Sequence, residues 1–170
     1  MPSREEIKDF IVSVALRSKL DLTDGYQNIK IHPDSVSDWT FTCYEGKFDS
    51  LVMQQGDCNA PATMIRAMNY LFQNVENLMI YLDHILIANH TYEEYINTIK
   101  QVLQIANTNK VWLNRHKCQF MPDKLAILGE YLTELELEAD ADRVHMIQQF
   151  PTAGNRRQLQ RFLGMVNYLW

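Results

Sequence analysis

The sequence predicts an α+β domain in which helices pack on one face of a mostly antiparallel sheet. Residues 78–88 form two apolar arms around a short polar break, which is typical of a tight hairpin. Amphipathic helical segments alternate with further β-prone segments along the chain. Of the 170 residues, 46% are hydrophobic and 22% are charged, a composition that suits one globular domain.

The first predicted element is a helix at residues 3–17. Ser3 and Glu6 have the spacing of a capping box, and the apolar residues that follow recur along one helical face. The period then shortens to that of a strand, which we expect to end at Asp21 or Leu22.

The remaining elements follow from helical or alternating apolar patterns that turn-forming residues separate. In chain order they are a strand through 29–31, strands at 39–43 and 48–53, a helix from 59 to about 72, the hairpin at 78–88, a helix capped by Thr91 and Glu94, a short strand at 111–113, a hairpin at 125–133, and helices at 141–150 and 156–168.

Two aspartates far apart in the sequence are candidate metal ligands. Asp83 lies with His84 at the predicted hairpin tip, and Asp21 interrupts a second apolar run far upstream. Carboxylates at strand ends suit divalent cations that prefer oxygen ligands, chiefly Mg²⁺, and two such ions about 4 Å apart can activate a 3′-hydroxyl and stabilise a leaving pyrophosphate. The structural alternative is that both aspartates are solvated surface residues, as most carboxylates are.

Composition limits the function classes. The formal net charge is −5, whereas a chain that binds nucleic acid by itself usually has a basic excess. Cys43, Cys58 and Cys118 are odd in number and widely spaced, which favours reduced thiols. The apolar runs are far shorter than a membrane span, and no charged-then-apolar leader precedes the first helix. We therefore expect an intracellular protein, cytoplasmic or nuclear, that is neither secreted nor in a membrane.

The two aspartates belong to a series of short motifs. These are Leu20-Asp21-Leu22-Thr23-Asp24-Gly25-Tyr26, Val52-Met53-Gln54-Gln55-Gly56-Asp57-Cys58-Asn59-Ala60-Pro61-Ala62-Thr63, Tyr81-Leu82-Asp83, Leu113 through Lys117-Cys118, and Leu128-Gly129. In order and spacing the series resembles the palm motifs of reverse transcriptases, most closely those of Gypsy-type LTR retrotransposons. Residues 162–168 resemble the helix that follows the palm in the same family, so the resemblance runs from about residue 18 to the C-terminus.

The resemblance implies a right-hand polymerase palm with partial fingers at 18–133, after an N-terminal helix at 1–17. Helices at 134–170 would lead toward a thumb or connection, and 1–170 would be a single reverse transcriptase-like domain. The implied activity is that of an RNA-directed DNA polymerase, a nucleotidyltransferase. It would use deoxynucleoside triphosphates, an RNA or DNA template-primer, and Mg²⁺ or Mn²⁺ as its cofactor.

The resemblance also implies roles for single residues. Asp21 and Asp83 match the metal-binding aspartates of the family, and the carbonyl of Leu22 would lie beside the same ions. Tyr26 matches the aromatic residue under the sugar that excludes a 2′-hydroxyl. The other nucleotide-binding positions are Gln55, Gly56 and Lys117, and the primer grip comprises Leu128, Gly129, Glu130 and Tyr131.

Several of these positions also have a purely structural explanation. Tyr26 suits a core tyrosine with its hydroxyl at the surface, Gln55-Gly56 an ordinary turn before a capped helix, and Lys117 a solvated charge. His116 and Cys118 suggest a zinc site, but no partner pair with proper ligand spacing accompanies them.

The chain departs from the family pattern at the hairpin tip, where His84 follows Asp83 in place of a second aspartate. The change removes a negative charge beside the metals, and imidazole suits Mn²⁺ or Zn²⁺ better than Mg²⁺. Most of the fingers and the whole thumb, connection and ribonuclease H have no counterpart in the 170 residues. We therefore expect impaired polymerase activity and consider a change of metal.

Three functions compete on this basis. The first is a polymerase palm, the second a catalytically dead remnant that binds protein or nucleic acid, and the third a nucleotide-binding module without turnover. Residues 162–170 are rich in apolar side chains, which predicts self-association or contact with missing polyprotein domains through residues 156–170.

Overall fold

The computed structural model describes residues 2–12, 14–127, 130–132, 137–139 and 141–167. The chain divides into two compact units, Met1–Pro122 and Asp123–Trp170. The division falls within residues 18–133, the range predicted for the palm with partial fingers. In the part of the chain that the structure describes, every helix is too short or too polar to cross a membrane.

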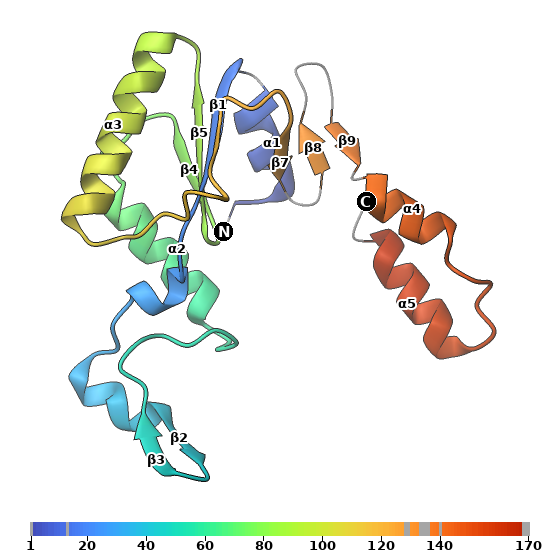
Figure 1. The fold of residues 1–170 in the computed structure, drawn as a ribbon, viewed down its shortest axis with the longest axis horizontal. Helices are drawn as coiled ribbons and strands as arrows, with labels where there is room; N and C mark the ends of the chain where they lie inside the picture. The colour runs from blue at the N-terminus through green and yellow to red at the C-terminus, as the bar shows by residue number, and fades with distance from the viewer. Residues whose placement is uncertain (1, 13, 128–129, 133–136, 140, 168–170) are drawn as a thin grey trace. The chain divides into compact units, whose positions relative to one another are not determined.

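The first unit is built on a four-stranded antiparallel sheet in the order β4-β5-β1-β6 (Figure 1). The strands are β1 (Leu16–Asp21), β4 (Leu78–Tyr81), β5 (His84–Asn89) and β6 (Gln119–Phe120). β1 pairs with the whole of β5, from Leu16 opposite Asn89 to Asp21 opposite His84. The predicted hairpin at 78–88 is confirmed as β4 and β5.

Helices α2 (Ala60–Leu71) and α3 (Tyr92–Thr108) cover one face of this sheet, and the main core lies beneath them (Figure 1). The capping box predicted for α3 is present, because Thr91 Oγ1 accepts a hydrogen bond from the Glu94 N–H and the Glu94 carboxylate accepts one from the Thr91 N–H. The buried core residues from strands and helices include Leu20, Leu22, Ile80, Ile85, Ile87, Met64, Met68, Phe72, Tyr95 and Val102.

Helix α1 (Arg4–Val12) contacts β5 from the other face of the sheet (Figure 1). It buries Ile7 and Ile11, and Leu86, which alternates with the core-facing residues of β5, is fully buried as well. The predicted helix at 3–17 is too long, because Leu16 already pairs with Asn89 in β1. Strand pairing here outweighs the helical spacing of the apolar residues.

The segment between β1 and α2 carries the 3-10 helices η1 (Gly25–Asn28) and η2 (Pro33–Trp39) and the hairpin of β2 (Thr40–Cys43) and β3 (Gly46–Asp49). Among the described residues no third strand pairs with this hairpin, and most of its residues are exposed. Phe41 and Phe48 stack across it, with 5.9 Å between their ring centroids. The predicted strand at 39–43 is confirmed.

Three predicted strands are wrong or too long. In each of them fewer residues pair with a neighbouring strand than the pattern of apolar residues predicts. The strand through 29–31 is a single bridge between Lys30 and Val52, because η1 takes up the chain before it. The strand at 48–53 ends at Asp49, which lies opposite Thr40, the first residue of its partner β2. The strand at 111–113 is a single bridge between Leu113 and Leu22.

The second unit contains the antiparallel sheet β7-β8-β9 and two helices. Its elements are β7 (Leu125–Ile127), β8 (Glu130–Leu132), β9 (Leu137–Ala139), α4 (Ala141–Gln148) and α5 (Arg156–Asn167). The predicted hairpin and both helices are present. β9 was not predicted, although leucine and glutamate alternate from 135 to 138, a period that indicates a strand. The rings of Phe150 and Phe162 lie 5.5 Å apart and join α5 to the segment after α4.

Leu86→Ala is expected to lower the free energy of unfolding by about 2–5 kcal/mol, because it removes a fully buried side chain on the face of β5 that α1 contacts. Leu51→Ala removes the same atoms from a residue that is 66% exposed and should change it by less than about 0.5 kcal/mol. Urea denaturation followed by circular dichroism measures both. Equal effects of the two substitutions would contradict this packing.

Candidate active site

The candidate site lies at the end of the sheet where β1 stops and the β4–β5 turn closes. Asp21, the last residue of β1, pairs with His84, the first residue of β5. Tyr81 also pairs with His84, so the two turn residues are Leu82 and Asp83 rather than the predicted Asp83 and His84. The left-handed φ of Leu82 lets the turn close one residue earlier than the pattern of apolar residues indicates.

Main-chain hydrogen bonds hold these segments together. The Leu22 N–H donates to the Asp83 carbonyl, and the Asn114 N–H donates to the Asp21 carbonyl, each at 2.8 Å. Leu82 has a φ of 52°, the left-handed region that a leucine rarely adopts. The two aspartates are therefore positioned by backbone pairing on both sides and by a strained turn.

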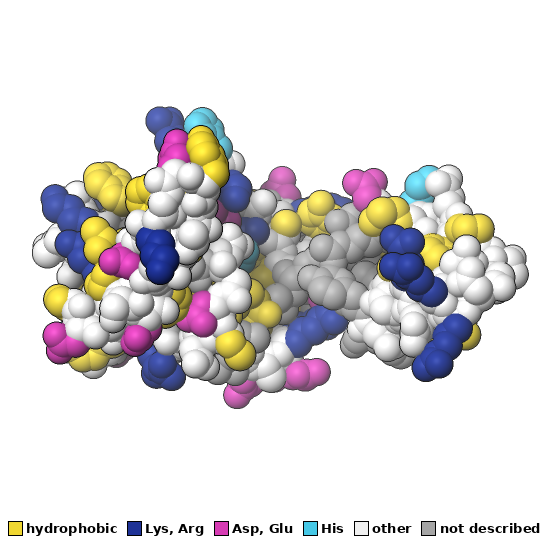
Figure 2. Space-filling model, turned by 90° about the horizontal axis from the view of Figure 1, so that it is seen from below, with side chains coloured by type: hydrophobic (Ala, Val, Ile, Leu, Met, Phe, Trp, Pro, Cys, Tyr) yellow, Lys and Arg dark blue, Asp and Glu magenta, His cyan; other side chains and the backbone are white. Residues whose placement is uncertain are grey.

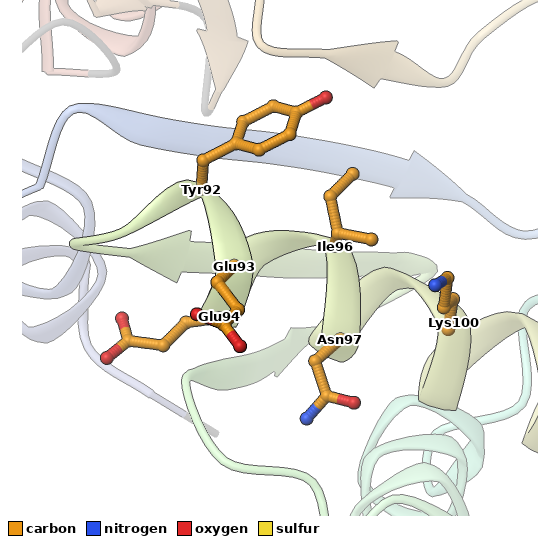
Figure 3. A pocket seen from close by; sticks show the side chains of 6 residues that line it. All are labelled: Tyr92, Glu93, Glu94, Ile96, Asn97 and Lys100. Carbon is orange, nitrogen blue, oxygen red and sulfur yellow. The ribbon is translucent and has the colours of Figure 1, made fainter.

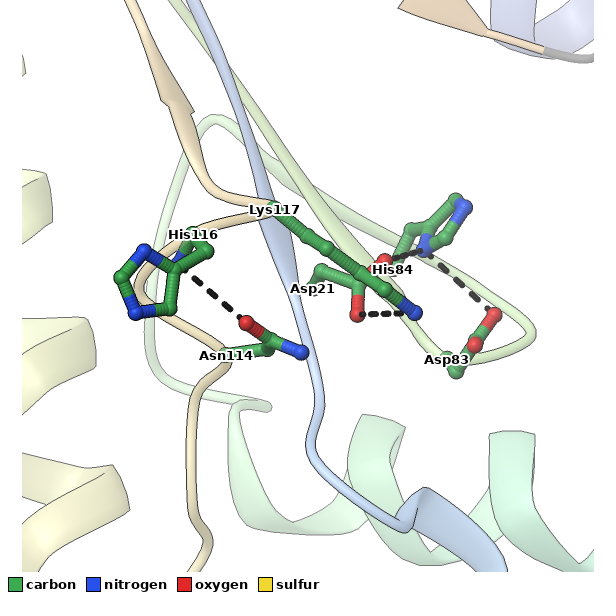
Figure 4. A network of polar contacts seen from close by, with 6 residues as sticks. All are labelled: Asp21, Asp83, His84, Asn114, His116 and Lys117. Carbon is green, nitrogen blue, oxygen red and sulfur yellow. Dashed lines mark hydrogen bonds and ion pairs between the residues drawn. The ribbon is translucent and has the colours of Figure 1, made fainter.

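Four side chains, those of Asp21, Asp83, His84 and Lys117, converge at this point (Figure 4). His84 Nδ1 lies 3.4 Å from Asp83 Oδ1 and 3.5 Å from Asp21 Oδ2. The Nζ of Lys117 lies 3.8 Å from Asp21 Oδ1, so the two carboxylate oxygens of Asp21 face different partners. The predicted residues Asp21, Asp83 and Lys117 are thus brought together, and His84 lies between the two aspartates.

The site is more buried at Asp21 than elsewhere. The side chain of Asp21 is 8% exposed, whereas that of Asp83 is 43% and that of Lys117 is 65% exposed. Burial lowers the pKa of the nearby Lys19 ammonium, while the negative charges of Asp21 and Asp83 act in the opposite direction. The two aspartates therefore make this end of the sheet negative, and the ammonium groups of Lys19 and Lys117 lie beside them.

A cavity of about 220 Å³ opens beside these side chains. The predicted residues that line it are Leu22, Tyr26, Gln55, Asp83 and Lys117. Gly56 does not line it; its φ of 99° places it in a region that favours glycine, which supports the turn interpretation of that residue. Tyr26 is half-buried and packs against the main core, so its ring has a fixed position at the cavity wall.

Sequence reasoning missed three cavity residues, Asp24, Gly25 and Gln27. They belong to the turn and the 3-10 helix that lie between β1 and the predicted strand through 29–31. Gly25 is buried, and a Cβ there would lie 2.9 Å from Met64 Cε and 3.5 Å from Asp83 Cβ. The Asp24-Gly25 pair directly after Asp21 and Leu22 was the available signal, because such a pair brings the backbone close to its neighbours.

A larger hollow of about 860 Å³ lies along the first turns of α3 (Figure 3). It is lined by Tyr92, Glu93, Glu94, Ile96, Asn97 and Lys100, all from that one helix. The Glu94 carboxylate is part of the capping box of α3, so its presence beside the hollow has a structural explanation. The convergence of charged side chains favours the smaller cavity as the functional site.

The donor set at the sheet end fits a divalent cation. One ligand atom each from Asp21, Asp83 and His84 lie within 4.8 Å of one another. Carboxylate oxygens suit Mg²⁺ and Mn²⁺, and an imidazole nitrogen adds affinity for transition metals. Asp21 and Asp83 would hold such an ion from two elements that the sheet fixes in place.

The predicted primer grip falls in the second unit. Leu128 and Gly129 lie outside the described residues. Glu130 and Tyr131 belong to β8, where Glu130 is buried and Tyr131 is exposed. Their contact with a primer stays a prediction.

Residues 11–132 match the family model described as reverse transcriptase (RNA-dependent DNA polymerase). This range contains the sheet, the cavity and every residue of the candidate site. The chain therefore belongs to the reverse transcriptase family.

Transposon polyproteins of Schizosaccharomyces pombe are among its relatives. The Tf2-7 and Tf2-3 polyproteins are 29% and 28% identical to the chain over 171 residues. The match covers 99% of the chain but 13% of each polyprotein, so the chain spans a small part of these relatives. The predicted resemblance to Gypsy-type retrotransposon enzymes is confirmed.

Solved structures of a foamy viral protease-reverse transcriptase have the same fold. The structure with dsDNA has a TM-score of 0.87 at 20% identity, covering 99% of this chain and 36% of that one. The structure with an RNA/DNA hybrid has a TM-score of 0.84 at 22% identity, covering 93% and 22%. The predicted α+β polymerase palm is confirmed.

The strand that carries Asp21 is tied to α3 by a buried hydrogen bond between Ser18 Oγ and Tyr95 OH, 2.7 Å long. Burial raises the pKa of Tyr95, and the hydrogen bond to Ser18 partly offsets this. A raised pKa in the folded state contributes stability that is fully present below pH 10.0 and is lost as the pH rises through the folded value.

Tyr95→Phe is therefore expected to destabilise the chain by about 1 kcal/mol at neutral pH, through loss of the hydrogen bond. The difference from the wild type should shrink as the pH is raised above 10.0. Thermal unfolding across this pH range measures it, with Tyr44→Phe, at an exposed tyrosine, as the control. A difference that stays constant or grows would contradict the assignment.

Proposed function

We propose that the chain is the catalytic palm of a transposon-encoded reverse transcriptase, which joins deoxynucleotides to a primer as an RNA or DNA template directs. The observation that carries this proposal is the convergence of Asp21 and Asp83 from two paired elements beside a cavity that Tyr26 and Lys117 line. Family membership supports the reaction class.

Each residue has a physical part in the proposed reaction. Asp21 and Asp83 would hold divalent metal, which when bound would supply the activation of the primer 3′-hydroxyl and the stabilisation of the leaving pyrophosphate. Lys117 is exposed enough to move from Asp21 to a bound triphosphate, where its charge offsets the charge that develops on the leaving group. Tyr26 places a ring at the cavity wall, where it would leave no room for a 2′-hydroxyl.

The proposed partners are a template-primer duplex and a deoxynucleoside triphosphate. The foamy viral protease-reverse transcriptase structures contain dsDNA and an RNA/DNA hybrid, which supports a duplex as the ligand. On the face shown in Figure 2, basic side chains are interspersed with acidic and apolar ones, and the net charge is −5. We propose that further parts of a longer polyprotein supply most of the affinity for the phosphate backbone.

His84 favours a second candidate function, a catalytically impaired module that binds nucleotide, nucleic acid or protein. It stands where the family pattern has a second aspartate, and its Nδ1 faces both remaining carboxylates. A site with one carboxylate fewer attracts two divalent cations less strongly. Binding without turnover is then the expected property of the chain.

Primer extension on a homopolymer RNA template separates the two candidates. With Mg²⁺, His84→Asp is expected to extend the primer about 100-fold faster than the wild type, because it restores a carboxylate that can hold a divalent cation at the site. The double variant with Asp21→Asn is the control and should be inactive. Extension by the wild type itself favours the polymerase. If neither the wild type nor His84→Asp extends the primer with Mg²⁺ or Mn²⁺, His84 is not the sole lesion and the binding function is favoured.

We also propose self-association through residues 156–170, of which 168–170 lie outside the described residues. Leu159 and Leu163 lie one turn apart on α5, and each is 48% exposed. Exposed apolar side chains on one helical face favour burial against a partner.

The variant with Leu159→Glu and Leu163→Glu is expected to shift the chain from dimer to monomer, measured by sedimentation equilibrium. Leu103→Glu, at a 43% exposed residue of α3, is the matched control and should leave the mass unchanged. A wild-type chain that is monomeric at every concentration tested would refute the proposal.

A further inference from the structure

We propose that His84 is itself a metal ligand, and that Asp21, Asp83 and His84 Nδ1 form a mixed oxygen and nitrogen site for one divalent cation that prefers Mn²⁺ or Zn²⁺ to Mg²⁺. The inference rests on the proposed function in one respect, namely that Asp21 and Asp83 are taken as metal ligands.

The distances at the site suit shared coordination. Ligand atoms about 2.1 Å from a metal lie about 3.4 Å apart in tetrahedral geometry and about 3.0 Å apart in octahedral geometry. His84 Nδ1 lies 3.4 Å from Asp83 Oδ1 and 3.5 Å from Asp21 Oδ2. Two of the three ligand-to-ligand edges thus have a tetrahedral length, and the partly exposed Asp83 on its turn can adjust the third.

The surroundings of His84 Nδ1 agree with this geometry. The atom is buried and has no hydrogen-bond partner among the described residues, although two carboxylates face it. A buried polar atom without a partner requires an explanation, and a bound ion is one of the common ones. With its proton on Nε2, the imidazole directs the lone pair of Nδ1 at the point between the two carboxylates.

The charge and the donor types define which cation fits. Two carboxylates and a neutral imidazole carry two negative charges, which one divalent cation balances, and Lys117 beside Asp21 opposes a second cation. Imidazole suits Mn²⁺ and Zn²⁺, whereas Mg²⁺ favours oxygen ligands and retains its waters. Histidine in place of aspartate at position 84 would therefore exchange one metal ligand for another and would not destroy the site.

Pulsed electron paramagnetic resonance on the full chain with Mn²⁺ tests the ligand directly, using protein without an affinity tag and buffer without nitrogen ligands. We expect ¹⁴N modulation from a directly bound imidazole in the wild type. It should vanish in His84→Asp and in His84→Gln. His116→Gln changes a nearby exposed histidine outside the proposed site and should keep the modulation.

Titration calorimetry gives the affinities. His84→Gln should weaken Mn²⁺ binding by about 10–100-fold, and Zn²⁺ should displace Mn²⁺ from the wild type more effectively than Mg²⁺ does. His84→Asp should narrow the preference for Mn²⁺ over Mg²⁺. Equal binding of Mg²⁺ and Mn²⁺ by the wild type would overturn the selectivity.

The outcomes separate this inference from the proposed function. Mn²⁺ binding that Asp21→Asn abolishes, but that shows no ¹⁴N modulation, overturns the role of His84 and leaves the aspartate pair intact. Mn²⁺ binding that Asp21→Asn leaves unchanged refutes the metal role of the pair, and both proposals fail. Because the wild-type spectrum needs no variant, misfolding of a variant cannot obscure the result.

Discussion

The antiparallel pairing of β1 with β5 is the constraint on which the rest of the molecule depends. It places Asp21 opposite His84 and, through the turn, beside Asp83. The same register directs Ile85 and Ile87 into the main core and Leu86 to the opposite face. Because side chains alternate along a strand, a slip of one residue would dismantle the core and the carboxylate cluster together.

The strands that carry the site are buried on both faces, which keeps them rigid. α2 and α3 cover one face and α1 contacts β5 on the other, while β1 is further joined to α3 through Ser18 and Tyr95. The charged side chains emerge at the end of the sheet, where the strands stop and water has access. A rigid base with ligands at its rim is a suitable geometry for holding a cation in one position.

The sequence predicted the parts that local patterns control. Asp21 and Asp83 were identified because each interrupts an apolar run, and the capping box of α3 is visible in Thr91 and Glu94. The turn was predicted one residue too far along the chain, at Asp83 and His84 instead of Leu82 and Asp83. The reason is that Leu82, which begins the turn in a left-handed conformation, is apolar and so looks like part of the strand in the sequence. Asp24 and Gln27 were missed, since the 3-10 helix beside the cavity depends on tertiary contacts.

The place of His84 on the backbone has an evolutionary consequence. Histidine and aspartate codons differ in their first base alone, so one point mutation separates this chain from the two consecutive aspartates of its family pattern. His84 is the first residue of a regular strand whose register its neighbours fix, and its side chain faces the carboxylates of Asp21 and Asp83. The fold therefore accommodates either residue at this position without rearrangement of the strands, and a single base change is enough to alter the charge at this end of the sheet.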